Sequence, residues 1–548
     1  MSIAASLNLN KWKNWADWKL LLFLVFFLDV KMGVKVAAII VAYLLAFDFR
    51  FGFSFKNSRL PLFYALAIAI AFFDWVIGRN FGFNYDVVLL TGIGFWLLCI
   101  LAMHQVKLSV DNHDAETINR TIILFFALNA AVSFFNLAAI IFETGHFNPY
   151  TYQGQYQKYF IGTGDYIRGI TFDMSTTNAI LNAFGVIYFL SKRNAAMLLL
   201  CMAVMLLTGS NCVNLLILLI LGAIFIFKST REQKSLILIC WMFMIIFMSQ
   251  VSPQNYMYVH ETIKNNFFPQ PIHTVPPAKP LPYITMRPDN TLTPEGKRQK
   301  TAQWHLDSIY TAEHPRPAPH KEYPITLETG RIIVPGVDIN SRPYQHIAET
   351  TAYQRQLLGF IGTHKTELPI SRDTAVIGHT PGKIVEMRQT LGFFKQHPFK
   401  LLTGDGAGNF SSKLAFRATA IGYAGGYPQK LAYINPDFLS NHLDIYLNFF
   451  SKNKDNHSLI NDPGSVYDQL LAEYGLIGLA GFAIWYLGYF IRHYKKLTYG
   501  IPLTILLLGV FFLAYWFEQL SILLFFELLM LLNIKENSKP KPPIYAKS

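Results

Sequence analysis

Long apolar runs recur along the chain, and short polar segments separate them. A helix needs roughly 20 mainly apolar residues to cross the hydrocarbon core of a bilayer. The pattern therefore predicts an all-α polytopic membrane protein with about twelve transmembrane helices. The clearest runs lie at about 60–78, 84–103, 121–142, 170–191, 194–208, 211–227, 235–251, 468–491, 501–516 and 519–534, and two weaker ones lie at about 18–30 and 34–49.

Composition agrees with this class. Of the 548 residues, 52% are hydrophobic and only 15% are charged, which is too apolar for a soluble chain of this length. The four cysteines lie inside apolar runs, where they are expected to pack as small apolar residues and to form no disulfide framework.

Lysine and arginine residues cluster in alternate loops of the predicted topology. If the N-terminus faces the cytoplasm, the basic loops near 50–59, 107–120, 192–193, 228–234 and 492–496 and the tail face it too. This is the positive-inside pattern, and it predicts that both termini are cytoplasmic. The net charge of +13 then reflects membrane orientation, and nucleic acid is not an expected partner, whereas the lipid bilayer is.

The same topology places one large loop domain on the outward side. We expect an N-terminal transmembrane bundle over residues 1–251 with a short outer loop at 143–169. A proline-rich insertion follows at 252–345, then a more regular outer region at 346–467 with helices near 350–358 and 383–395. Transmembrane helices at 468–534 and a basic tail at 535–548 complete the chain.

Two arginines are predicted at the outer membrane face. Arg168 precedes a span, and Arg388 lies on the predicted helix at 383–395. An arginine at this depth needs a counter-ion. A diphosphate is one, because guanidinium binds phosphate oxygens in bidentate geometry. The alternative is snorkelling or a local ion pair with Asp165, Asp173 or Glu386.

A glycine turn and a re-entry motif follow Arg388. The turn is Gly404-Asp405-Gly406-Ala407-Gly408, and the motif LLAEYGLIG at 470–478 enters a span. Together with Arg168, the polar segment 173–178 and Arg388, this order resembles the O-antigen ligase and O-antigen polymerase (Wzy-type) superfamily of bacterial membrane glycosyltransferases. The resemblance covers roughly residues 168–490, apart from the proline-rich insertion.

The resemblance implies a metal-independent, cofactor-free glycosyltransferase in the bacterial inner membrane, with its large loop in the periplasm. Its donor would be an undecaprenyl-pyrophosphate-linked glycan, and its acceptor a glycan or the lipid A-core. Arg168 and Arg388 match the two arginines that hold the pyrophosphate and stabilise it as a leaving group. No convincing metal-ligand spacing is present in the sequence.

The chain departs from the family pattern at two positions, and the first departure favours polymerase over ligase. Family ligases carry a His-Asn pair where this chain has Gly464-Ser465, and many relatives carry an arginine at the position of Asn211. A replacement base is His457 or Asp462, although a histidine in such a loop is more often an ordinary surface residue. Glu473 is expected either to orient an arginine or to cap the re-entering helix.

Aromatic and glycine residues are the expected glycan contacts. Tyr152, Tyr156 and Tyr159 alternate with polar residues in the short outer loop, which suits stacking on sugar rings, although an interfacial aromatic belt gives the same pattern. Further expected contacts are Gly406, Gly408 and Tyr467. Two other functions remain open: a polysaccharide flippase or transporter, and an inactive relative that serves as an assembly partner.

Overall fold

The computed structural model describes residues 15–45, 60–78, 82–152, 164–253, 381–421, 425–449 and 459–538, together with a few isolated positions. Within these residues the fold is helical and contains no strand. The expected helix at 350–358, most of the proline-rich insertion and the basic tail lie outside the described residues.

A helix lies in each of the twelve apolar runs predicted from the sequence. Their bounds are α2 (Trp18–Phe27), α3 (Met32–Leu45), α4 (Phe63–Gly78), α5 (Phe83–Asn112), α6 (Ala115–Thr144), α7 (Ser175–Lys192), α8 (Ala195–Leu207), α9 (Asn211–Phe227), α10 (Arg231–Ile246), α20 (Val466–Gly481), α22 (Gly500–Val510) and α24 (Ser521–Glu536). α5 and α6 extend well beyond their predicted ends, because polar residues continue the helix past the apolar run.

Among the described residues, four helical stretches are long and apolar enough to cross a membrane. They are Phe83–Asn112, Ala115–Thr144, Arg231–Val251 and Val466–Ile491. Other apolar helices of 10–17 residues accompany them, including Phe63–Gly78 and Asn211–Phe227. These apolar helices indicate a membrane protein.

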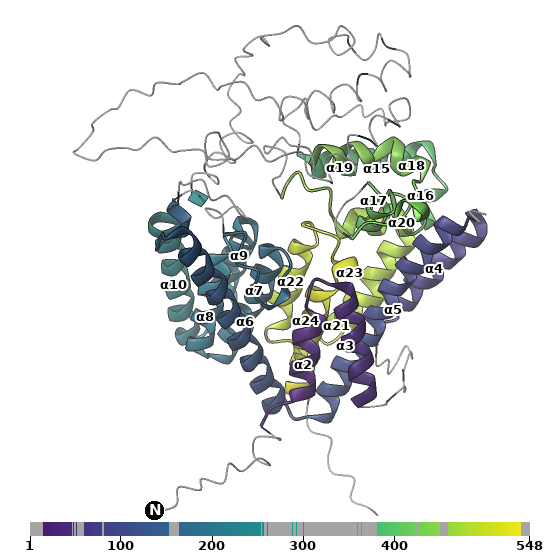
Figure 1. The fold of residues 1–548 in the computed structure, drawn as a ribbon. Coiled ribbons are helices and arrows are strands. Elements are labelled where there is room, and N and C mark those ends of the chain that lie inside the picture. The colour runs from purple at the N-terminus through teal and green to yellow at the C-terminus, as the bar shows by residue number, and fades with distance from the viewer. Residues whose placement is uncertain are drawn as a thin grey trace, which may run out of the picture.

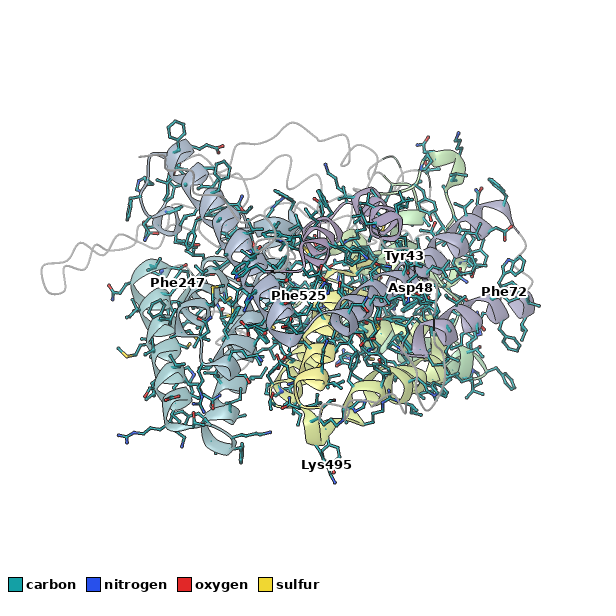
Figure 2. All side chains as sticks on the ribbon, turned by 90° about the horizontal axis from the view of Figure 1, so that it is seen from below. Tyr43, Asp48, Phe72, Phe247, Lys495 and Phe525 are labelled. Atoms are coloured by element: carbon teal, nitrogen blue, oxygen red, sulfur yellow. The ribbon has the colours of Figure 1, made fainter. Side chains whose placement is uncertain are left out.

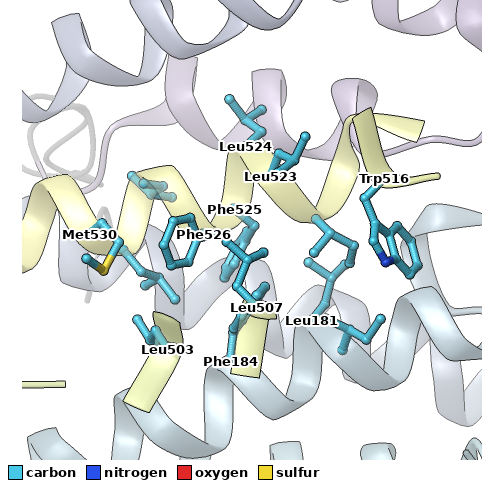
Figure 3. Packing of buried hydrophobic residues seen from close by; sticks show 14 of the residues in the cluster. Leu181, Phe184, Leu503, Leu507, Trp516, Leu523, Leu524, Phe525, Phe526 and Met530 are labelled. Atoms are coloured by element: carbon cyan, nitrogen blue, oxygen red, sulfur yellow. The ribbon is translucent and has the colours of Figure 1, made fainter. Parts of the chain in front are cut away.

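The helices form two groups around a central one. α6 and α8–α10 lie on one side, α4, α5 and α20 lie on the other, and α24 runs between them (Figure 1). Seen from below, Phe247 and Phe72 mark opposite edges with Phe525 between them (Figure 2). Phe525 and Phe526 of α24 are fully buried, and they pack toward Phe184 of α7 and Leu507 of α22 (Figure 3).

A layer of shorter helices lies at one end of this bundle, on the side of α4, α5 and α20 (Figure 1). The sequence predicts α15 closely, with a range of 383–395 against the observed Gly382–Gln396. The other helices near this end are α16 (Lys400–Thr403), α17 (Lys413–Ala418), α18 (Pro436–Asn441), α19 (Leu443–Phe449) and α23 (Trp516–Gln519).

Several of the predicted basic loops meet at the opposite end. Lys192 Nζ lies 2.5 Å from Glu536 Oε1 at the end of α24. Lys535 donates to the carbonyl oxygens of Val110 and His113, where α5 ends. The turn after α7, the turn after α5 and the end of α24 therefore lie together.

A buried lysine joins α3 to the start of α24. Lys35 of α3 is 1% exposed, and its ammonium donates to the Phe27 carbonyl at 2.7 Å and to Ser521 Oγ at 2.9 Å. Ser521 begins α24 and donates in turn to the Leu28 carbonyl at 3.2 Å. These hydrogen bonds link the hairpin of α2 and α3 to the start of α24.

Candidate functional site

The motif at 470–478 forms a helix that breaks at Gly475. Gly475 has φ 64° and ψ −168°, which interrupts α20 and leaves carbonyl groups before it without helical donors. The Ala472 carbonyl accepts from Asp405 N at 2.8 Å, and the Glu473 carbonyl accepts from Gly406 N at 3.2 Å. The break therefore supplies the acceptors that anchor the glycine turn.

The Glu473 side chain completes this anchor. Glu473 is 1% exposed, and its Oε2 accepts from Gly408 N at 2.9 Å while Oε1 accepts from Phe410 N at 3.3 Å. A carboxylate that accepts backbone N–H groups forms strong, charge-assisted hydrogen bonds. Glu473 thus holds the loop, which differs from both roles expected for it, orienting an arginine or capping the re-entering helix.

The glycines of the turn face protein. Gly404, Gly406 and Gly408 have φ of +89°, +91° and +74°, a region that L side chains rarely adopt. A Cβ at Gly404 would overlap the Glu473 backbone, and one at Gly406 would lie 3.1 Å from the Tyr85 hydroxyl. These glycines permit close packing of the turn on α20 and α5 (Phe83–Asn112).

Two cations on α17 lie close to this turn in the sequence. Lys413 and Arg417 are four residues apart, so they share one face of the helix, and both are half-buried. In the described part of the chain neither forms a salt bridge within 4.0 Å. Half-buried cations without an acidic partner at that distance are suited to binding an anion.

The electrostatics of Lys413 connect α17 with three other segments. Burial lowers the pKa of Lys413, and the Arg417 guanidinium lowers it further. The carboxylates of Asp173, Glu518 and Asp462 raise it in part. The polar segment before α7, the short helix α23 and the loop before α20 therefore all act on this ammonium group.

Asp462 lies in the loop that leads into α20. Burial raises the pKa of its carboxyl group, while Lys383 and Lys413 lower it. Two residues later, a Cβ at Gly464 would lie 3.2 Å from Ala514 Cα and 3.3 Å from Asp462 Oδ1. A side chain at position 464 would therefore be crowded by Ala514 and Asp462.

The two predicted arginines occupy different settings. Arg168 is half-buried in the turn before α7, where its backbone N–H donates to Asn136 Oδ1 at 3.2 Å. Arg388 is exposed on α15, whereas Glu386 and Thr390 on the same helix are buried. The register of α15 thus turns Arg388 away from the buried face that contacts α20.

The tyrosines that were predicted to contact the glycan also lie in different settings. Tyr467 is half-buried, and its hydroxyl donates to the Leu508 carbonyl at 2.7 Å, which ties α20 to α22. Tyr152 is half-buried, and its ring lies edge-on to His146 at 5.4 Å between centroids. Tyr156, Tyr159 and His457 lie outside the described residues.

A second polar centre is buried beneath α15. Thr390 Oγ1 donates to Asp468 Oδ2 at 2.9 Å and lies 3.2 Å from His442 Nε2, while Ser411 Oγ donates to Glu386 Oε1 at 3.0 Å. Burial lowers the pKa of His442 to about 3 and raises that of Glu386 well above its ordinary value. The imidazole is therefore neutral at physiological pH.

Lys413 and Arg417 were missed in the sequence because their spacing looks like an ordinary polar helix face. The one hint in the sequence is their position. They follow the glycine turn, and the other four residues of the six-residue helix α17 are apolar. His442 gave no signal either, because its partners Glu386 and Asp468 are distant in the chain.

No protein-family model, curated protein or solved structure matches this chain.

Proposed function

We propose that this protein is a membrane glycosyltransferase that polymerises a glycan carried on undecaprenyl pyrophosphate. In this proposal, twelve helices span the bacterial inner membrane, both termini are cytoplasmic, and the layer of short helices faces the periplasm. The observation that carries the proposal is the pair of half-buried cations, Lys413 and Arg417, which form no salt bridge within the described residues.

A lipid-linked pyrophosphate fits this pair by charge and by size. Side chains four residues apart on a helix are separated by roughly 5–6 Å at Cβ, which suits two neighbouring phosphate groups. A half-buried cation also binds an anion more strongly than an exposed one, because less water screens the charge. Lys413 and Arg417 would therefore stabilise the negative charge that develops on the leaving pyrophosphate.

Arg168 is the third proposed phosphate ligand. Asp173, five residues later, acts electrostatically on Lys413, which supports a short separation between the start of α7 and α17. Arg388 is exposed on α15 and would contact the glycan or phosphate only from the aqueous side.

Asp462 is the proposed general base. Its carboxylate would take the proton of the acceptor hydroxyl as that oxygen attacks the anomeric carbon. The bond between the anomeric carbon and the phosphate oxygen then breaks, and undecaprenyl pyrophosphate leaves with the bonding electrons. Burial raises the pKa of Asp462, which makes it a stronger base than an exposed aspartate.

Polymerase is preferred to ligase because of Gly464. A histidine there would bring its Cβ within 3.2 Å of Ala514 Cα, so the ligase arrangement does not fit without a local shift. The alternative, transfer to the lipid A-core, is distinguished by the acceptor that is consumed.

The test uses the full chain in nanodiscs with synthetic lipid-linked repeat units, scored for released undecaprenyl pyrophosphate and for glycan length. Lys413→Ala and Arg417→Ala should each lower the rate by about 100-fold. Lys395→Ala, an exposed lysine on α15, is the matched control and should keep the wild-type rate.

Wild-type rates in the Lys413 and Arg417 variants would overturn their assignment. An inactive wild-type protein, with a related polymerase active under the same conditions, would favour the assembly-partner alternative. Release that requires the lipid A-core would identify a ligase.

A further inference from the structure

The buried centre beneath α15 (Gly382–Gln396) brings together three side chains that bind metals in other proteins. One ligand atom from each of Glu386, His442 and Asp468 lies within 4.8 Å of the other two. All three residues are at most 1% exposed. They come from α15, from the residue between α18 and α19, and from α20, so only the folded chain assembles them.

Their hydrogen bonds leave capacity for a further partner. Asp468 Oδ1 and His442 Nδ1 are buried and have no hydrogen-bond partner among the described residues. Two carboxylates and an imidazole buried without full hydrogen bonding are costly. A cation placed between them would use the unfilled capacity of Asp468 and balance the carboxylates.

Neighbouring hydroxyl groups are arranged to support such a cation. Thr390 donates to Asp468 Oδ2, and Ser411 and Tyr515 contact Glu386 Oε1 at 3.0 and 3.1 Å. Donors of this kind fix carboxylate ligands in place around a metal. Lys383 is nearby, but its ammonium donates to the carbonyl oxygens of Asp462, Gly464 and Leu513.

We propose that Glu386, His442 and Asp468 bind a zinc-sized divalent transition-metal ion. Imidazole with two carboxylates is a ligand set that zinc accepts, and a water molecule would complete its tetrahedron. Calcium and magnesium are disfavoured because they take oxygen ligands almost entirely. The ion would be structural, since it would join α15 and the residue between α18 and α19 to α20. This proposal does not depend on the proposed glycosyl transfer.

The first experiment measures metal in the purified full-length protein by mass spectrometry after dialysis. We expect one zinc ion per chain, bound by the three side chains and a water molecule. His442→Gln and Asp468→Asn should lower the content to background. The matched control is His397→Gln, an exposed histidine at the end of α15, which should keep its zinc.

The second experiment removes the ion with a chelator and adds Zn²⁺ back while thermal unfolding is followed. The wild-type protein should lose thermal stability on chelation and regain it with zinc, whereas His442→Gln should respond to neither step. A wild-type protein without zinc, both as purified and after Zn²⁺ addition, would overturn the proposal. Equal zinc in wild type and His442→Gln would also overturn it, since the ion would then be bound elsewhere.

Discussion

Two loops in this molecule are held by side chains from neighbouring helices, but by different chemistry. The turn at 167–171 is held by amides: Asn136 Oδ1 accepts from the N–H groups of Arg168 and Gly169 at 3.2 Å each, and Asn178 Nδ2 donates to the Ile167 carbonyl at 3.1 Å. The glycine turn at 404–408 is held by the Glu473 carboxylate and by the broken backbone of α20.

The difference follows from the hydrogen bonds that an amide and a carboxylate can form. An amide both donates and accepts and carries no charge, so it can bind both N–H and C=O groups at low cost in apolar surroundings. A carboxylate only accepts, but it binds N–H groups more strongly. The turn with Arg168 is thus fixed by neutral groups, whereas the glycine turn, which precedes Lys413 and Arg417 in the sequence, is held by a buried carboxyl group.

The largest expected loss of stability comes from replacing Gly404, because this glycine packs against the backbone of α20. In Gly404→Ala the new Cβ would overlap the backbone of Glu473, at a φ of +89°. Backbone cannot rotate away as a side chain can, so we expect a loss of about 3 kcal/mol or more in the free energy of unfolding. Thermal unfolding in detergent measures this.

Gly392→Ala is the control for that change. Gly392 lies within α15, and nothing is within 4 Å of its built Cβ. This variant should be stabilised by roughly 0.5–1 kcal/mol, because alanine loses less entropy than glycine in a helix. Equal destabilisation of both variants would contradict the close packing inferred for Gly404.

A smaller loss of stability is expected when the side chain that anchors each loop is replaced. Glu473→Gln weakens a buried acceptor for two N–H groups and should cost about 1–3 kcal/mol. Asn136→Ala also removes an acceptor for two N–H groups, but Asn136 is half-buried, so water replaces it and the cost should be about 1 kcal/mol. Hydrogen exchange at 408–410 and 168–169 localises each loss.

Glu232→Gln is a control for the charge change, since Glu232 is exposed and should shift stability by less than about 0.5 kcal/mol. If Asn136→Ala lowered the free energy of unfolding more than Glu473→Gln, the inferred difference between the two loops would be wrong.

The last expected effect is a pH dependence that Asp405 contributes at the glycine turn. Burial raises the pKa of Asp405 to about 7, against the opposing effect of Lys400. The folded state therefore binds more protons at Asp405 than the unfolded state, so stability falls as pH rises from about 4 to about 7. Asp405→Asn should remove this component, and Asn136→Ala should leave it unchanged.

Unfolding midpoints of both variants across this range test the point. A wild-type protein that gained stability relative to Asp405→Asn with rising pH would show that the ion pair with Lys400 outweighs the burial of Asp405.

The sequence predicted the helices well because long apolar runs report burial in lipid or protein directly. The glycine turn and the re-entry motif were also visible, since positive-φ turns require glycine. The outward position of Arg388 was not predictable, because it depends on the register of α15 against α20. Lys413, Arg417 and His442 were missed because distant contacts, rather than local spacing, determine their settings.

The lysine that joins α3 to α24 has a consequence for biosynthesis. Lys35 leaves the ribosome long before Ser521 is made, so its ammonium enters the membrane with the Phe27 carbonyl as its nearby native acceptor and without the hydroxyl that completes its site. The hairpin of α2 and α3 is therefore incomplete until α24 is inserted. A chain truncated before residue 521 should remain recognisable to quality-control proteases as unfinished.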